Sequence, residues 1–399
     1  MSRLMSILLA AVFACMAQTC LAEPLWHIRI DPPKRSIWVA WYTDSHVWYQ
    51  HSPMTVVKII NVESGRHEQP LTELSKNWPI HILQDPQVLE KVYCVSTQSL
   101  VYDTLLKEPV RTIRQPMDYR IRPVHYNDNI IFPNGYRSLN LISIDKQGEI
   151  QWTCQMPGYV MSHPISMGPL MMAQTRQGSY GGQATFAVNL NDGTILWKDV
   201  TDAYGSGVVF SDDAQYTIEA NSWMAPGKAR THVYCRVALT GEVIWKRILD
   251  RYHVYHRPLL DTNTNLVYIL SDSHGDNRHN RENALFCFVV QTGELLWKAN
   301  LTKGISIAKG SYSYEPYYPC MQFYKGRILL CHEDETIGVY DPQNGMKLHT
   351  VYPESYLPVP RKRPSNQRCR FLLPPTILHD KLILVTRYNV MALDAKVLF

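Results

Sequence analysis

Residues 237–245 read VALTGEVIW, and residues 289–297 repeat the pattern as VVQTGELLW. In both stretches an alternating apolar segment leads into a Thr-Gly turn, and a Trp stands four residues after the Gly. The same spacing occurs in ISIDKQGEIQW (142–152) and VNLNDGTILW (188–197). The four copies share these Gly and Trp positions: Gly148 and Trp152, Gly193 and Trp197, Gly241 and Trp245, Gly293 and Trp297.

Weaker copies of the pattern extend it over most of the chain. Gly65 and Gly345 keep the turn without the Trp, and residues 100–110 and 390–399 are degenerate copies. From Gly148 onward the glycines are 45, 48, 52 and 52 residues apart. Eight copies over the 377 residues left after removing 22 from 399 average about 47 residues, the length of a four-stranded propeller blade.

Each copy predicts a β-hairpin, because alternating apolar residues flank a turn where Gly can adopt a left-handed conformation. Helical periodicity is missing from the sequence. We therefore predict an all-β fold, an eight-bladed β-propeller of four-stranded antiparallel blades. The stretch PLWHIRI (24–30) has no blade of its own, and the last copy stops at Phe399 where another strand should follow. We expect these N- and C-terminal strands to pair and close the ring.

The alternating strand, the Asp/Asn/Thr-Gly turn and the Trp four residues later resemble the pyrroloquinoline-quinone-type repeat. The resemblance implies that Trp152, Trp197, Trp245 and Trp297 pack against the neighbouring blade. In repeat type and size the chain also resembles the propeller lipoproteins of the bacterial outer-membrane barrel-assembly machinery. Quinone-dependent dehydrogenases of this type carry adjacent cysteines beside the cofactor and a calcium ion. This sequence has no adjacent cysteines, so no cofactor is predicted.

The N-terminus predicts export. Arg3 precedes an apolar run from Leu4 to Phe13, followed by small residues up to Ala22, as in a secretory signal peptide. We expect residues 1–22 to be removed and residues 23–399 to form a single periplasmic, cell-surface or secreted domain. Lipid attachment at Cys15 or Cys20 is the less favoured alternative, because the residues before them fit a lipid-attachment box poorly. The mature chain has no apolar run long enough to cross a membrane, so association would be peripheral at most.

Seven cysteines remain after the signal segment, without any CxxC pair. In CMQFYKGRILLC (320–331), a turn at Lys325 and Gly326 would pair Tyr324 with Arg327 and place Cys320 opposite Cys331. The two cysteines could form a disulfide or remain adjacent buried thiols.

Two polar stretches are candidate sites. Asp272, His274 and Asp276 alternate in SDSHGDNRHNREN (271–283) and form a weak candidate metal site, with a solvated loop as the alternative. A Pro-bounded basic stretch is a possible partner-binding loop, with a solvated surface loop as the alternative; it contains Arg361, Lys362, Arg363, Arg368 and Arg370.

The preferred function is a non-catalytic, monomeric binding module that presents its loops to another envelope or extracellular protein. The net charge of +5 and the predicted export argue against nucleic acid as a partner. A quinoprotein-like oxidoreductase using pyrroloquinoline quinone with calcium is one alternative. A calcium-dependent glycan-binding propeller is another.

Overall fold

A computed structural model provides the fold of the chain. The residues that it describes are 24–29, 37–51, 57–68, 80–84, 92–96, 100–103, 108–112, 115, 117, 121–135, 137–160, 164–176, 183–201, 204–225, 228–254, 257–273, 283–301, 321–331, 336–352, 371–386 and 389–399. In these ranges no helix is long and apolar enough to cross a membrane.

The described strands form eight separate antiparallel sheets, so the chain is all-β as predicted. The sheets of the first half of the chain consist of β2 (Ile37–Tyr42), β3 (His46–His51) and β4 (Val57–Asn61); β5 (Ile80–Gln84), β6 (Val92–Ser96), β7 (Leu100–Asp103) and β8 (Glu108–Thr112); β9 (Val124–Tyr126), β10 (Asn129–Pro133), β11 (Asn140–Ile144) and β12 (Ile150–Gln155); and β13 (Tyr159–Val160), β14 (Ile165–Met167), β15 (Leu170–Arg176), β16 (Gln183–Asn189) and β17 (Ile195–Thr201).

The second half forms four more sheets. They consist of β18 (Tyr204–Phe210), β19 (Tyr216–Ala225), β20 (Lys228–Val237) and β21 (Val243–Asp250); β22 (Tyr252–Val254), β23 (Leu259–Asp261), β24 (Leu266–Ser273), β25 (Asn283–Val289) and β26 (Leu295–Asn300); β27 (Met321–Tyr324), β28 (Arg327–Cys331), β29 (Ile337–Tyr340) and β30 (Lys347–Val351); and β31 (Phe371–Leu378), β32 (Lys381–Thr386), β33 (Asn389–Asp394) and β1 (Trp26–Arg29). A 3-10 helix, η3 (Ala395–Leu398), follows β33.

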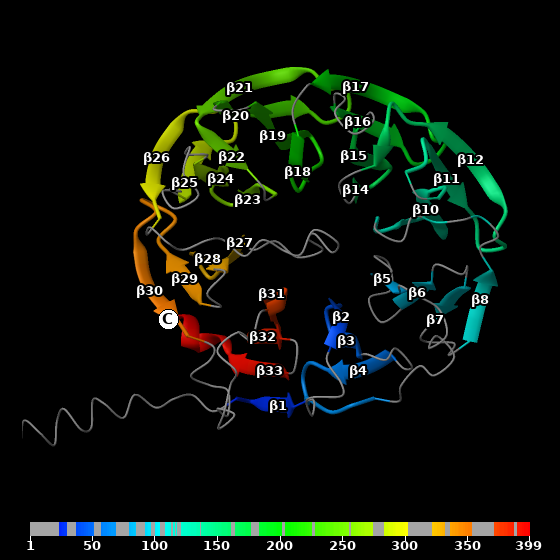
Figure 1. Cartoon of the computed structure of the whole chain (residues 1–399), viewed down its shortest axis with the longest axis horizontal. Coiled ribbons are helices and arrows are strands. Elements are labelled where there is room, and N and C mark those ends of the chain that lie inside the picture. The colour runs from blue at the N-terminus through cyan, green and yellow to red at the C-terminus, as the bar shows by residue number, and fades with distance from the viewer. Residues whose placement is uncertain are drawn as a thin grey trace, which may run out of the picture.

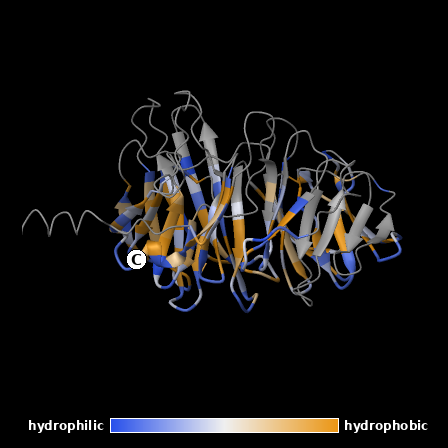
Figure 2. Ribbon diagram, turned by 90° about the horizontal axis from the view of Figure 1, so that it is seen from below, coloured by the Kyte–Doolittle hydropathy of each residue, from blue (hydrophilic) through white to orange (hydrophobic). Residues whose placement is uncertain are grey.

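The sheets follow one another around a centre in chain order (Figure 1). Strands β12, β17, β21, β26 and β30 lie on the outside, while β18, β23, β27 and β31 lie nearer the centre. From the side, apolar residues run along the strands and hydrophilic residues occupy the turns at one face (Figure 2). Each sheet therefore presents an inner edge, an outer edge and two faces that meet its neighbours.

The two ends of the chain meet in one sheet. Strand β1 pairs antiparallel with β33, with Trp26 opposite Ala392 and Arg29 opposite Asn389. The backbone N–H of Leu25 donates to the carbonyl of Ala392 at 2.9 Å. This is the pairing that the sequence predicted from the stretch at 24–30.

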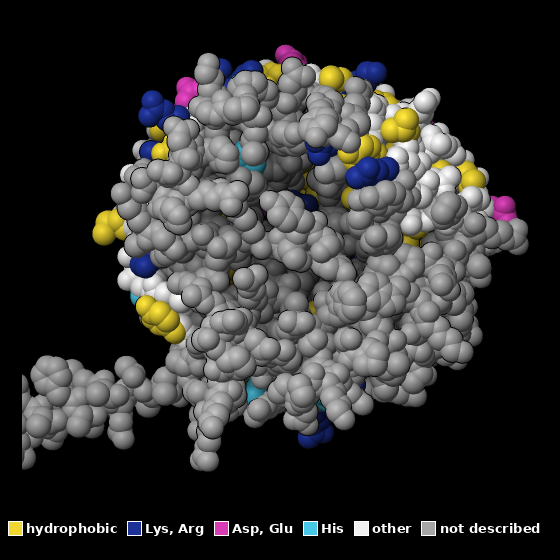
Figure 3. All heavy atoms as spheres, in the orientation of Figure 1, with side chains coloured by type: hydrophobic (Ala, Val, Ile, Leu, Met, Phe, Trp, Pro, Cys, Tyr) yellow, Lys and Arg dark blue, Asp and Glu magenta, His cyan; other side chains and the backbone are white. Residues whose placement is uncertain are grey.

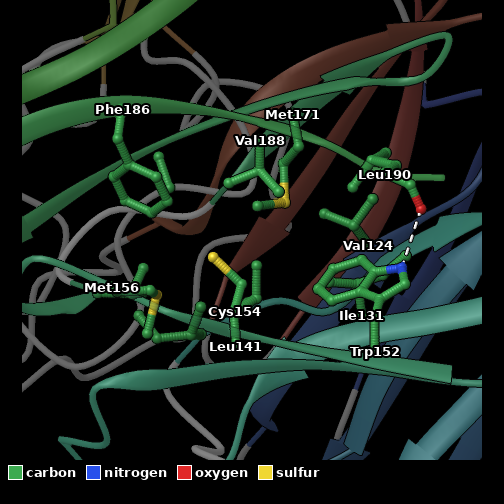
Figure 4. Packing of buried hydrophobic residues seen from close by; sticks show 13 residues of the cluster. Val124, Ile131, Leu141, Trp152, Cys154, Met156, Met171, Phe186, Val188 and Leu190 are labelled. Carbon is green, nitrogen blue, oxygen red and sulfur yellow. Dashed lines mark hydrogen bonds between the residues drawn. The ribbon is translucent and has the colours of Figure 1, made fainter. Parts of the chain in front are cut away.

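The core lies between neighbouring sheets. In Figure 4, Leu141 and Cys154 of one sheet pack with Met171, Phe186 and Val188 of the next. Alternation explains this placement, because successive residues of a strand point to opposite faces and each face meets another sheet. Apolar burial is thus divided among the gaps between sheets.

Candidate functional site

The repeat Trp residues join each sheet to the next. The indole N–H of Trp152 donates to the carbonyl of Leu190 at 3.1 Å (Figure 4). The equivalent bonds run from Trp197 to Ala238 (2.8 Å), Trp245 to Val290 (2.6 Å) and Trp297 to Pro342 (3.1 Å). Each acceptor belongs to the turn of the following sheet, so each of these four side chains is hydrogen-bonded to the neighbouring sheet.

The repeat Gly lies beneath the Trp ring of the preceding sheet. Gly241 and Gly293 have positive φ angles of 74° and 65°. A Cβ at Gly293 would stand 2.5 Å from the ring of Trp245, and one at Gly241 would stand 2.5 Å from the ring of Trp197. Both the backbone conformation and the ring contact therefore require Gly at this position.

Trp26 is a further member of this series that the repeat pattern did not reveal. Its indole N–H donates to the carbonyl of Val62 at 3.0 Å, and its ring covers Gly65 too closely for any Cβ. Trp26 belongs to the first described strand, whereas its sheet is otherwise built from the C-terminus. The sequence did hold one indication of this role. Trp26 lies in the N-terminal stretch at 24–30 that belongs to no copy of the repeat, and the copy with which that stretch pairs, at 390–399, lacks a Trp.

A buried ion cluster connects two neighbouring sheets, the one that contains β17 and the one that contains β20. Arg236 on β20 donates from Nε to Glu219 and from Nη2 to Asp199, which lies on β17 of the preceding sheet. Its Nη1 donates to the carbonyl of Gly241 at 3.1 Å. Burial alone would lower the pKa of Arg236, but the charges of Glu219 and Asp199 outweigh it and raise this pKa. The cluster ties the two sheets together through one guanidinium shared by two carboxylates.

Arg257, unlike Arg236, is a partly buried cation without a described carboxylate as its partner. It stands just before the inner strand β23, and its backbone lies against Gly207 of β18. Burial, together with the nearby positive charge of Arg122, lowers the pKa of Arg257 to about 10. No described carboxylate pairs with Arg257. A partly buried guanidinium in this situation favours an anion as a neighbour.

A pocket of about 300 Å³ lies where the chain ends meet, lined by residues that include Tyr324, Lys325, Asp380 and Phe399. Its principal charges are already paired, because Lys325 contacts Asp380 at 2.8 Å. Hydrogen bonds from Lys325 and Tyr324 lower the pKa of Asp380. The pocket therefore offers little uncompensated charge to a ligand.

The outermost strands carry exposed apolar side chains. On β17, β21 and β26 they are between 38% and 55% exposed: Leu196, Val200, Val243, Ile244, Ile248, Leu295 and Leu296. Figure 3 shows apolar side chains along the outer edge of the ring, interspersed with Lys and Arg. Large exposed apolar groups of this kind commonly mark contact surfaces.

The predicted metal residues are only partly described. Asp272 lies in β24, with its backbone opposite Asn283, whereas His274 and Asp276 lie outside the described residues. Within the described ranges, no group of three or more His, Cys, Asp or Glu side chains could hold a metal ion. The metal site stays a prediction.

The remaining predicted site residues are those of the hairpin at 320–331 and those of the basic loop at 361–370. Tyr324 pairs with Arg327, which confirms the predicted register of that hairpin. Cys331 is buried with a free thiol, and Cys320 is outside the described residues, so a bond between them stays a prediction. The five basic residues of the predicted partner-binding loop (361–370) also lie outside the described residues.

The all-β fold and the repeated Gly and Trp positions are those of a protein with pyrroloquinoline-quinone-type repeats. Residues 120–271 match the family described as outer membrane protein assembly factor BamB. Over these residues the chain carries pyrroloquinoline-quinone-type repeats, as the sequence indicated. No curated protein matches the chain in a sequence comparison.

Three solved structures are similar to this chain at low sequence identity. The computationally designed Ika8 protein is 10% identical with a TM-score of 0.59, covering 93% of this chain and 99% of its own. Quinohemoprotein alcohol dehydrogenase ADHIIG from Pseudomonas putida HK5 is 10% identical with a TM-score of 0.56, covering 92% of this chain and 75% of its own. BamB from Moraxella catarrhalis is 12% identical with a TM-score of 0.40, covering 79% and 96%. The first two show a common architecture and nothing about activity.

Proposed function

We propose that the chain is an exported, non-catalytic propeller that binds another protein of the cell envelope. The observation that carries the proposal is the match of residues 120–271 to a family described as an outer membrane protein assembly factor. A factor of that kind acts on other proteins. The exposed apolar side chains on β17 and β21 lie within the matched residues and suit such a role.

The proposed architecture is a closed, eight-bladed ring. The eight described sheets and the pairing of β1 with β33 support it. The sheet of β2–β4 has three described strands, and a bridge between Ile60 and His67 marks where its fourth strand would begin. We further propose that residues 1–22 are removed on export and that the mature chain is a monomer in the periplasm or at the cell surface.

Crosslinking in the envelope tests the proposed function. The full chain would be expressed with its own N-terminus, crosslinked in intact cells and purified under denaturing conditions. We expect a mature chain beginning near residue 23 and one envelope protein recovered at near-stoichiometric yield. A chain that keeps residues 1–22 in the cytoplasm would contradict export, and an exported chain with no crosslinked protein would contradict the scaffold role.

Arg257 favours a second candidate, the binding of an anionic ligand near the centre. Pyrroloquinoline quinone carries carboxylates that suit such a cation, but the described residues offer no acidic cluster for the calcium ion that accompanies it. The test is a thermal shift with pyrroloquinoline quinone or citrate, for the native chain and for Arg257→Gln. Stabilisation that Arg257→Gln removes and Arg230→Gln retains would support this candidate, and an unchanged melting temperature would contradict it. The calcium-dependent glycan-binding alternative predicts calcium-dependent retention on a glycan array.

A further inference from the structure

Three neighbouring outer strands carry the same pair of exposed residues around the repeat Trp. The residue before the Trp is apolar and between 38% and 48% exposed: Leu196 on β17, Ile244 on β21 and Leu296 on β26. The residue after it is an exposed lysine, and we call these three the rim lysines: Lys198, Lys246 and Lys298. Positions two apart in a strand share a face, so each apolar residue and its lysine point the same way.

Two of the rim lysines lie over aromatic rings, and none of the three forms an ion pair with a described carboxylate. Lys246 lies opposite Tyr234, with its Nζ 5.1 Å from the ring centroid. Lys298 lies opposite Phe286, and its Nζ is 4.8 Å from the ring of Tyr252. Among the described residues no Asp or Glu forms an ion pair with a rim lysine. The stems therefore pack on the sheet while the ammonium groups stay available to a partner.

Strand β21 offers the longest free edge of the three. It is the terminal strand of its sheet and spans eight residues, Val243–Asp250. Its face with Lys246 also carries Ile244 and Ile248, which are 44% and 48% exposed. A terminal strand leaves alternate backbone N–H and C=O groups unpaired, and an extended segment can bind there as an added strand.

Resting on the proposed scaffold function, we infer that the free edge of β21 binds an extended, acidic segment of a partner protein. The segment adds a strand to the sheet. It places a carboxylate beside Lys246 and apolar side chains beside Ile244 and Ile248. On the opposite face the Arg247 side chain donates to the carbonyls of Gly293 and Thr292, at 2.6 Å and 2.9 Å, and also to the carbonyl of Lys246 on β21 itself, at 3.0 Å. The added strand must displace the bond to Lys246 wherever it uses that carbonyl.

A protein segment suits this surface better than a membrane does. The three strands that carry the rim lysines, β17, β21 and β26, lie at successive positions around the outside of the molecule, so each faces outward in a different direction (Figure 1). A flat bilayer would meet only a small part of such a convex surface, whereas an extended segment needs a single strand. Opposite charges across a strand pair also add favourable energy to the backbone hydrogen bonds.

The experiment uses a photoreactive peptide with the core Val-Thr-Glu-Thr-Val, which has the same pattern in both strand directions. The second peptide has Lys in place of Glu. We expect the acidic peptide to crosslink to residues 243–250 of the full chain. Lys246→Glu should lower that yield about fivefold and raise the yield of the basic peptide by a similar factor. Lys146→Glu, a charge reversal at an exposed lysine in a turn of a different sheet, is the control and should change neither yield.

A second pair of variants tests the apolar contact. Ile244→Lys with Ile248→Lys should abolish crosslinking, whereas Leu239→Lys, at a site 63% exposed in a turn of the same sheet, should not. Crosslinks outside 243–250, or equal yields for both peptides, would overturn the inference. Binding to phosphatidylglycerol vesicles that depends on Lys246, without peptide crosslinking, would overturn it in favour of a lipid surface. If envelope crosslinking finds a partner while the peptide fails, only this inference falls.

Discussion

At the scale of single residues, the contact between a Trp and a Gly of the next sheet is the repeating unit of this molecule. Trp245 is 6% exposed, donates to Val290 and lies on Gly293. A large ring needs a flat surface, and a residue without Cβ supplies it while adopting the left-handed turn conformation. Sequence spacing and tertiary contact thus have the same physical origin.

Gly293→Ala tests this contact. The new Cβ would meet the ring of Trp245 and also occupy a positive φ, so we expect the free energy of unfolding to fall by about 2–4 kcal/mol. Gly326→Ala is the control, because its φ is 73° but no atom lies within 4 Å of the added Cβ. Denaturant unfolding of both variants provides the measurement. Equal losses would show that backbone strain alone matters.

The buried thiols lead to a second prediction at this scale. Cys235 and Cys287 lie opposite Trp245 and Trp297 in their hairpins. Burial raises the pKa of both thiols from 9.0 to about 12. Because the thiolate is the reactive form, we expect neither to react with an alkylating reagent at pH 8 until the protein unfolds. Peptide mass mapping would follow each site, and rapid labelling of the folded chain would contradict the burial.

At the scale of elements, neighbouring sheets are joined by polar ties as well as by Trp rings. Arg236 binds Glu219 within its own sheet and Asp199 in the preceding one. Glu219 has a fully buried side chain, so it depends on this single guanidinium for its counter-charge. Such a tie is asymmetric in its energetics, because the loss of one partner costs far more than the loss of both.

Arg236→Met should therefore lower the free energy of unfolding by about 3–5 kcal/mol, since it leaves Glu219 buried without a counter-charge. The double variant Arg236→Met, Glu219→Leu should recover much of that loss. Thermal and denaturant unfolding of the single and double variants would measure the difference. A double variant as unstable as the single one would show that packing around Arg236, rather than charge, is responsible.

At the scale of the whole molecule, the N-terminal and C-terminal strands together form one sheet. Strand β1 supplies the outer strand of the sheet that β31–β33 begin, and Trp26 reaches across to Gly65 of the neighbouring sheet. Ile28 packs with the same core, which contains Val47, Val385 and Val390. The first described strand therefore connects the last sheet to the first.

Removal of residues 1–29 tests that connection. We expect the free energy of unfolding to fall by at least about 3 kcal/mol relative to a chain lacking only residues 1–23, because Trp26 and Ile28 leave the core. The edge of β33 would also become exposed, so we expect a greater tendency to aggregate. Calorimetry and light scattering would measure both effects. Equal stability of the two chains would contradict the proposed role of β1 in joining the last sheet to the first.

Local spacing made most of the architecture predictable. The Gly-to-Trp interval in residues 237–245 and 289–297 identifies hairpins and their repeat, and the turn at Lys325 and Gly326 established a register that the structure confirms. The candidate site was less predictable. The rim lysines stand beside each repeat Trp in the sequence, but their exposure and the absence of a described counter-charge depend on neighbouring sheets.

By itself, the sequence determined the all-β class, the repeat and the Gly and Trp positions, because hairpin turns and strand alternation depend on residues close together in the chain. It also predicted the pairing of the chain ends, because the last copy of the repeat lacked a strand and the N-terminal stretch supplied one. Only the tertiary structure decided which atoms of neighbouring sheets are in contact. Trp26 joins the Trp series through Gly65, Arg236 finds Asp199 on another sheet, and β21 keeps a free edge. The first two contacts join residues 39 and 37 positions apart, and the third feature depends on which strand ends a sheet. Local spacing carries no information about either.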